Sequence, residues 1–283
     1  MILIGDSGST KTEWVILTQG ETYTYHTQGI NPMFNSIDEI EQIIRTELYP
    51  QLIHKTGFQK ICFYGASVST EERTNRIKVA MNRVFGDTPN EINHDLLAAA
   101  RALCGNKAGI ACIIGTGSNS CVYDGENITD NIPSLAYILG DEGSGAHMGK
   151  TLLNLHFYKK LPAETSAELD KYLGKNLPEV LETIYRQPLA NRYLASLTRF
   201  IDEHKQVAGV KAIVNNCLNA FIDLLIYSYP NAKTLPVHTV GSVGFVFADE
   251  FKELLNAKGL TAGTTIKAPM PGLINYHITE LTT

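Results

Sequence analysis

Three short glycine-rich segments carry most of the residues that could hold a charged ligand. They read GDSGST at residues 5–10, GTGSNS at 115–120 and VGSVG at 240–244. Glycine lets the backbone approach a ligand closely and adopt positive φ, so several N–H groups can converge on phosphate oxygens. Neither a P-loop nor a Rossmann fingerprint occurs, because the first two segments run into strand-like sequence and not into a helix. The sequence therefore indicates phosphate binding in hairpin turns.

Acidic residues stand beside these turns or at the ends of other elements. Asp6 follows an apolar strand directly at the first turn, where a carboxylate can hold Mg²⁺ or its waters; stabilisation of its own turn is the alternative. Asp95 lies between NEINH and LLAAARAL, a position that predicts a helix N-cap. Asp141 and Glu142 lie in GDEGSG, too rich in glycine for a helix interior, and a solvated acidic turn is the alternative.

The elements that must position these residues follow from apolar periodicity. The first thirty residues read as three strands, and residues 60–67 read as a central strand. Helical spacing predicts helices over about 36–56 and 71–85, and residues 150–230 are dominated by helix. Residues 235–247, LPVHTVGSVGFVF, are predicted to form a further strand with a glycine-rich turn.

The strand–turn–strand pattern of the N-terminus restarts near Ala108. ILIGDSGST (2–10) aligns with CIIGTGSNS (112–120), which matches Gly5 with Gly115. A repeat at this distance predicts two related domains, with chance similarity of two glycine turns as the alternative. We place the domains at residues 1–105 and 106–283.

Composition excludes several classes of protein. The 283 residues include 24 Lys+Arg and 29 Asp+Glu, a net charge of −5 with no basic cluster, so nucleic acid is a poor partner. No uninterrupted apolar stretch approaches the length of a membrane span, so we expect no membrane partner. The five cysteines are dispersed in mostly apolar surroundings, which predicts buried, reduced thiols and a cytoplasmic protein.

The loops together resemble a known superfamily. GDSGSTKTEW resembles the first phosphate loop of the sugar kinase, actin and heat-shock chaperone ATPases, GTGSNS their second phosphate loop, and VGSVG their adenosine loop. GTGSNS followed by LGDEGSGAHMGK (139–150) is similar to N-acetylglucosamine kinase and the BadF/BadG/BcrA/BcrD ATPase family. The resemblance implies an α/β fold of two ribonuclease H-like (actin-like ATPase) domains flanking an interdomain cleft, with one loop in the first domain and two in the second.

The resemblance also implies ATP and Mg²⁺ as cofactors and a set of site residues. The expected ATP contacts are Gly8, Ser9, Thr10, Lys11, Thr116, Gly117, Gly241 and Ser242. The expected sugar contacts are Asn31, Asp95, Ser118, Asn119 and Asp141. Asp95 would be the catalytic base and Asp6 the metal ligand. For Asn31 an Asn-Pro turn is the alternative, and its NPMF context departs from the kinases, which leaves the 2-substituent of the sugar open.

The implied reaction is ATP-dependent phosphorylation of an amino sugar, with N-acetylglucosamine to its 6-phosphate as the leading expectation. N-acetylmuramic acid or glucosamine is the alternative acceptor, and a homodimer is compatible with the resemblance. A different class is an ATPase that activates a partner enzyme. Family members of that kind hold an iron–sulfur cluster, for which the scattered cysteines offer no paired ligands.

Overall fold

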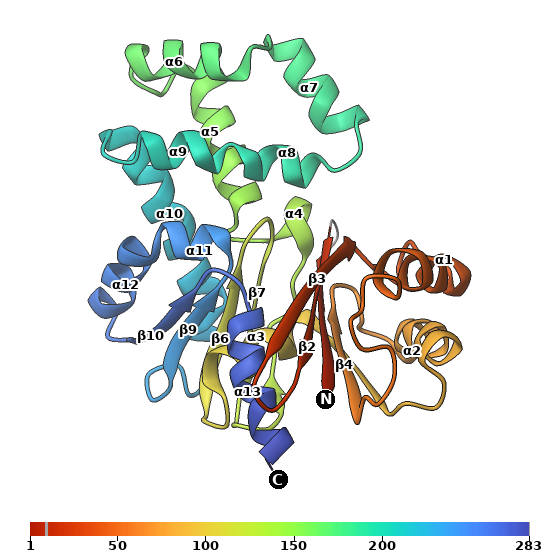
Figure 1. Ribbon diagram of the computed structural model, residues 1–283. Helices are drawn as coiled ribbons and strands as arrows, with labels where there is room; N and C mark the ends of the chain where they lie inside the picture. The colour runs from red at the N-terminus through yellow and green to blue at the C-terminus, as the bar shows by residue number, and fades with distance from the viewer. Residues whose placement is uncertain (9–10, 283) are drawn as a thin grey trace. The chain divides into compact units, whose positions relative to one another are not determined.

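The computed structural model describes residues 1–8 and 11–282, and the chain forms two compact units, each with its own five-stranded sheet (Figure 1). The first unit comprises residues 1–106, 125–127 and 269–283, and the second comprises 107–124 and 128–268. The C-terminal residues therefore belong to the first unit, whereas the sequence analysis assigned them to the second domain.

The C-terminal helix returns to the first unit because both of its sides find partners there. Met270 and Leu273 pack into an apolar cluster with Ile4 and other residues of the first sheet. On the same helix, the Nε2 atom of His277 lies 2.8 Å from the hydroxyl of Tyr64 in that sheet. Neither contact has a local sequence signal.

The sheet of the first unit has the strand order β3-β2-β1-β4-β5. β1, β2 and β3 form an antiparallel meander, and β4 and β5 run parallel to β1. The elements of this unit are β1 Ile2–Ser7, β2 Lys11–Leu17, β3 Thr22–Gln28, α1 Ile37–Ile43, a π-helical turn Ile44–Leu48, β4 Lys60–Gly65, α2 Glu71–Phe85, β5 Asn90–His94, α3 Asp95–Cys104 and α13 Met270–Thr282.

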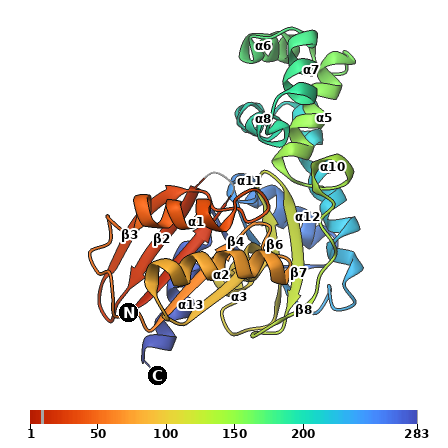
Figure 2. The same cartoon turned by 90° about the vertical axis from the view of Figure 1, so that its right-hand side faces the viewer.

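Helices cover both faces of this sheet (Figure 2). Successive side chains of β1 point to opposite faces. Leu3 packs in one cluster with residues of α1 and α2, and Ile4 packs in another with Ala98 of α3 and Leu273 of α13. By the same alternation Asp6 lies on the face of Ile4, which α3 covers.

The sheet of the second unit repeats this topology, with the order β10-β9-β6-β7-β8. β6, β7 and β8 are antiparallel, and β9 and β10 run parallel to β6. The elements are β6 Gly109–Ile114, β7 Ser118–Tyr123, β8 Ile128–Asp130, α4 Ala136–Leu139, α5 Gly145–Phe157, α6 Ala163–Leu173, α7 Leu177–Arg186, α8 Ala190–Ser196, α9 Thr198–Glu203, α10 Ala208–Leu224, a 3₁₀ turn Ile226–Ser228, β9 Pro236–Val240, α11 Ser242–Val246, α12 Ala248–Ala257 and β10 Thr261–Ile266.

The shared strand order supports the internal repeat but corrects its register. The first hairpin closes with the pair Ser7 and Thr12, and the second closes with Ile114 and Ser118. Gly8 is therefore the counterpart of Gly115, and the sequence match of Gly5 with Gly115 is wrong. Strand pairing, and not residue identity in the loops, fixes the equivalence.

Two predicted elements end earlier than expected. The helix expected to reach about residue 56 ends with the π-helical turn at Leu48, because Pro50 has no backbone N–H with which to continue the helical hydrogen bonds. The strand expected through residue 247 ends at Val240, and α11 begins directly after Gly241, whose carbonyl accepts the N–H of Phe245. The third glycine loop therefore opens a helix.

One helical stretch among the described residues, Ala208–Ser228, is long and apolar enough to cross a membrane by length and composition. Half of its apolar window is buried inside the structure. Its α-helical part, α10, places Val214, Leu218 and Phe221 in the hydrophobic core of the second unit. Core packing accounts for its composition.

Candidate active site

Asp6 occupies the last position but one of β1, at the edge of the first glycine turn. Burial raises the pKa of its carboxyl to about 7, and the negative charges of Asp95 and Glu13 add to the rise while Lys11 opposes it. No hydrogen bond joins the Asp6 carboxylate to a described residue. A cation bound next to Asp6 would be stabilised by these negative charges.

Asp95 is the first residue of α3 and not its N-cap, which corrects the sequence analysis. His94 is the cap, and its Nδ1 atom accepts the N–H of Leu97 at 3.3 Å. Burial raises the pKa of Asp95 to about 6, although the N–H of Leu96 opposes the rise. His94 thus satisfies one N–H of the first turn, so Asp95 is not needed as the cap residue.

The first loop is described only in part. The N–H of Gly8 donates to the carbonyl of Lys11 at 3.1 Å, and Lys11 is exposed at the start of β2. Ser9 and Thr10, both expected ATP contacts, lie outside the described residues. The hydrogen bond between Gly8 and Lys11 therefore closes the base of this loop.

Asn31 is buried in a turn of the first unit. Its Oδ1 atom accepts the N–H of Met33 at 2.9 Å, and its own N–H donates to Oδ1 of Asn35 at 2.9 Å. This is the turn geometry that the sequence offered as the alternative to a sugar contact. A direct contact between Asn31 and a sugar stays a prediction.

Asp141 is buried in the loop between α4 and α5 of the second unit, with only 8% of its surface exposed. The carboxylate oxygen Oδ1 accepts hydrogen bonds from the N–H of Ser118 and the hydroxyl of Ser134, both at 3.2 Å. Burial raises the pKa of Asp141, and these two donors oppose the rise. The interpretation as a solvated turn therefore does not apply to this residue.

Gly117 lets this carboxylate approach the second phosphate loop. A Cβ atom at Gly117 would lie 2.8 Å from Oδ2 of Asp141, closer than real Cβ contacts allow. The start of α5 holds the same loop, because Gly145 and Ala146 donate their N–H groups to the carbonyls of Gly115 and Thr116. The second phosphate loop and the Asp141 carboxylate are therefore held in fixed positions. The side chain of Thr116 in this loop is exposed to solvent.

Ser118 and Asn119, the other expected sugar contacts of this unit, already have partners within the protein. The hydroxyl of Ser118 donates to the carbonyl of Glu142 at 2.7 Å. The Oδ1 atom of Asn119 accepts the N–H of Ser120 at 2.9 Å and the amide of Asn131 at 3.2 Å. Their roles toward a sugar stay predictions.

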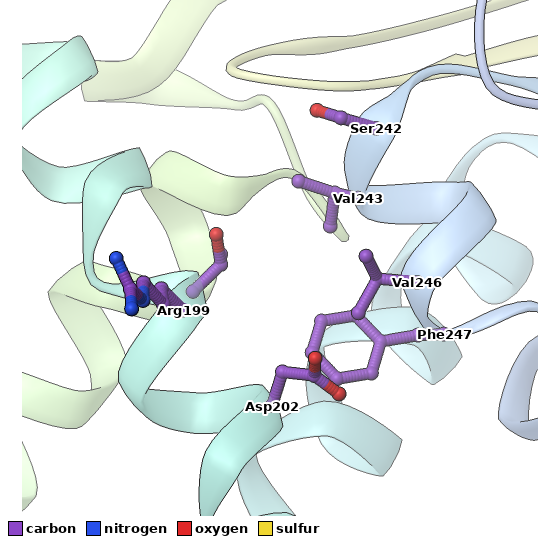
Figure 3. Close-up of a pocket in the computed structure, with 7 residues that line it drawn as sticks. Arg199, Asp202, Ser242, Val243, Val246 and Phe247 are labelled. Atoms are coloured by element: carbon purple, nitrogen blue, oxygen red, sulfur yellow. The ribbon is translucent and has the colours of Figure 1, made fainter.

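The third glycine loop borders a cavity of about 230 Å³. Gly241 has φ 126°, and a Cβ atom there would lie 2.4 Å from the carbonyl oxygen of Ile114, so glycine is required. Figure 3 shows the cavity between α9, which carries Arg199 and Asp202, and α11, which carries Val243 and Val246. The residues that line it are Thr198, Arg199, Asp202, Ser242, Val243, Val246 and Phe247. Mixed apolar and polar lining suits a flat heterocyclic base.

Sequence reasoning missed several of these neighbours. Arg199 and Asp202 belong to a helical region without a motif, so nothing local marks them. Ser134 precedes Asp141 in an irregular segment and likewise carries no signal. Glu13 could have been found, because the hairpin pairs it directly with Asp6.

Comparison with known proteins gives a result at the level of structure. No protein-family model and no curated protein matches the chain. A protein from Porphyromonas gingivalis, assigned provisionally as an N-acetylglucosamine kinase, superposes with a TM-score of 0.93 and 38% sequence identity, covering 99% of each chain.

Two further structures share the fold at lower identity. A provisional N-acetylglucosamine kinase from Chromobacterium violaceum has a TM-score of 0.76 and 15% identity, covering 97% of this chain and 98% of its own. A non-polymerising mutant of MamK bound to AMPPNP has a TM-score of 0.59 and 12% identity, covering 100% of this chain and 98% of its own. The expected two-domain α/β fold of actin-like ATPases is confirmed. From its identity with the Porphyromonas gingivalis protein over nearly its whole length, the chain belongs to the N-acetylglucosamine kinase-like family of actin-like ATPases.

Proposed function

We propose that this protein is an ATP-dependent sugar kinase that transfers the γ-phosphoryl group to an amino sugar, with N-acetylglucosamine as acceptor and its 6-phosphate as product. The observation that carries the proposal is the pair Asp6 and Asp95, two desolvated carboxylates at the end of β1 and the start of α3. The names of the P. gingivalis and C. violaceum proteins support the choice of acceptor.

Asp95 is the proposed general base. A pKa of about 6 leaves its carboxylate mostly ionised at neutral pH and still basic enough to take a proton from a sugar hydroxyl. Its position in the first turn of α3 places the negative charge at the positive end of the helix dipole. The proton would pass from the 6-hydroxyl to the Asp95 carboxylate as the hydroxyl oxygen attacks the γ-phosphorus, and the bond from that phosphorus to the β,γ-bridging oxygen would break to release ADP.

The residues around Asp6 fit Mg²⁺. The ion prefers oxygen ligands and takes one or two protein carboxylates, and here Asp6 is desolvated beside the charges of Asp95 and Glu13. Such crowding without a compensating cation raises the pKa of Asp6, and bound Mg²⁺ would relieve it. Mg²⁺ would neutralise charge on the transferred phosphoryl group, and Asp6 would hold it or its waters.

The loops of the second unit have proposed binding roles. Thr116 and Gly117 would contact phosphate from the second loop, as Gly8 and Lys11 would from the first. Gly241 and Ser242 would border the nucleotide base in the cavity under α11, whose apolar wall includes Val246. Asp141 would accept hydrogen bonds from sugar hydroxyls, because its hydrogen-bond donors among the described residues bind Oδ1 and not Oδ2.

An assay of ADP release over a panel of acceptors tests the proposal. The panel contains N-acetylglucosamine, glucosamine, N-acetylmuramic acid and no sugar, each with ATP and Mg²⁺, and the product is identified by ³¹P and ¹H NMR. We expect the highest kcat/KM and a 6-phosphate product with N-acetylglucosamine. ADP release that is independent of sugar would favour an ATPase regulating a partner. A higher kcat/KM with another sugar of the panel would support a sugar kinase but would show that N-acetylglucosamine is not its preferred acceptor.

A further inference from the structure

A second cavity of the second unit lies between α5 and α7 and is larger than the one under α11. Its volume is about 770 Å³, and α4 and α8 contribute the rest of its lining. Figure 1 shows α5, α7 and α8 together above the sheet strands, and α4 beside the upper end of β7. Small-molecule sites typically have volumes of about 300–1,000 Å³ and mostly apolar walls. Of the residues assigned above to ATP, Mg²⁺ or sugar, none that the structure describes lines this cavity.

Each long helix presents one continuous face to the cavity. α7 contributes Val180, Leu181 and Ile184, which share a face at helical spacing. α5 contributes Lys150, Leu153, Asn154 and Phe157 at the spacing i, i+3, i+4, i+7. The wall from α7 is apolar, whereas the wall from α5 is interrupted by an ammonium and a carboxamide one turn apart.

Lys150 and Asn154 are the two polar side chains that α5 contributes to this cavity. Within the described residues, neither side chain makes a hydrogen bond or an ion pair, and Lys150 is only partly exposed. Its charge helps to lower the pKa of Asp141, but the two groups form no ion pair. A cation on an apolar face with no ion-pair partner among the described residues indicates that a ligand can supply a negative charge in direct contact.

We propose that this cavity binds an amphipathic monocarboxylate with an unbranched aliphatic chain. The carboxylate accepts hydrogen bonds from Lys150 and Asn154, and the chain lies along Val180, Leu181 and Ile184. The charge of Lys150 favours such a ligand over an uncharged apolar molecule. A second copy of the chain is the competing occupant, since Tyr185 at the rim is 80% exposed, but it would have to bring a carboxylate to Lys150.

Isothermal titration of the whole protein with decanoate, below its micellar concentration and without ATP or sugar, tests this inference. We expect saturable binding at one site. Lys150→Met should weaken decanoate binding by about 10- to 100-fold, the usual effect of a lost charge-assisted hydrogen bond, and leave decanol binding unchanged. Asn154→Asp, at an exposed position, should weaken it by about tenfold or more through repulsion. Lys171→Met, on the exposed side of α6, is the matched control and should bind as wild type.

Leu181→Asp tests the apolar wall, and Leu224→Asp is its control. The two leucines are 42% and 58% exposed, so neither change disrupts a core, and only Leu181 lines the cavity. We expect loss of decanoate binding in Leu181→Asp alone. The inference is overturned if wild type does not bind decanoate, or if Lys150→Met and Lys171→Met bind it equally. It is also overturned if sedimentation shows a dimer that Leu181→Asp dissociates and decanoate does not.

Discussion

Asp6 on β1 and Asp95 on α3 lie close enough in the first unit for the charge of Asp95 to help raise the pKa of Asp6. Asp6 lies at the end of β1 on the face that α3 covers, and Asp95 begins α3. Two ionised carboxylates that are both shielded from water repel each other and destabilise the fold at neutral pH. A bound cation, or a proton on one of them, removes this repulsion. Such an arrangement is typical of a functional site.

Asp95→Asn should lower kcat for sugar phosphorylation by about 10²–10⁴-fold, because a general base contributes about that factor. Nucleotide binding, measured by calorimetry, should stay close to wild type. Asp87→Asn, an exposed aspartate of the same unit, is the control and should keep full activity. Near-normal turnover of Asp95→Asn would leave the residue with a structural role only.

The pH dependence of kcat/KM should show an acid limb near pH 6. Asp95 must be ionised to accept a proton, and its raised pKa of about 6 means that activity falls roughly tenfold per pH unit well below that value. Initial rates from pH 5 to pH 8 at saturating ATP and Mg²⁺ measure the limb. A flat profile over this range would contradict the assignment of the base.

Asp6→Asn should stabilise the ligand-free protein at alkaline pH. Burial raises the pKa of Asp6 from its ordinary value of 3.8 to about 7 in the fold. The protonated side chain is therefore tolerated at low pH, and the protein loses stability as pH rises from about 4 through about 7 and the proton leaves. At pH 8 the substitution should increase the free energy of unfolding by up to about 4 kcal/mol, and at pH 4 it should change it little.

Urea unfolding of Asp6→Asn and wild type at the two pH values measures this difference, and the variant should lose turnover with Mg²⁺. A difference in stability that does not vary with pH would show that Asp6 is not desolvated in the fold. Asp87→Asn again serves as control, since it is exposed.

Asp141→Ala should raise KM for the sugar by about 10- to 100-fold, the cost of losing hydrogen bonds to a charged group, with little change in KM for ATP. Glu142→Gln, in the same loop, should keep KM near wild type. Gly117→Ala should also raise KM for the sugar, because the added methyl would displace the Asp141 carboxylate, and it should raise KM for ATP as well, because Gly117 is a proposed phosphate contact. Steady-state kinetics with each substrate varied in turn separate these effects.

Val246→Trp should raise KM for ATP by at least about tenfold, because the indole would fill the cavity under α11 where the base is proposed to bind. Phe245→Trp is the matched control: Phe245 is exposed on the same helix but does not line the cavity. Equal KM values for the two variants would place the nucleotide base elsewhere.

Sequence alone predicted the elements whose signals are local. Apolar periodicity predicted β1 to β4 and α2, and the glycine turns marked where strands end. The repeat could be inferred from two similar hairpins, and the shared strand order supports it. The register of that repeat could not be inferred from sequence. Strand pairing sets the register, and glycines in the two loops can be aligned in more than one way.

Tertiary structure decided what lies next to each candidate residue. Asp95 was a predicted N-cap, but His94 takes that role, and only packing of α3 on the sheet brings Asp95 within the electrostatic influence of Asp6. The C-terminal helix joins the first unit through His277 and Tyr64, residues more than two hundred positions apart. A local pattern reports the conformation of its own segment, whereas burial and charge depend on segments that the chain brings together only on folding.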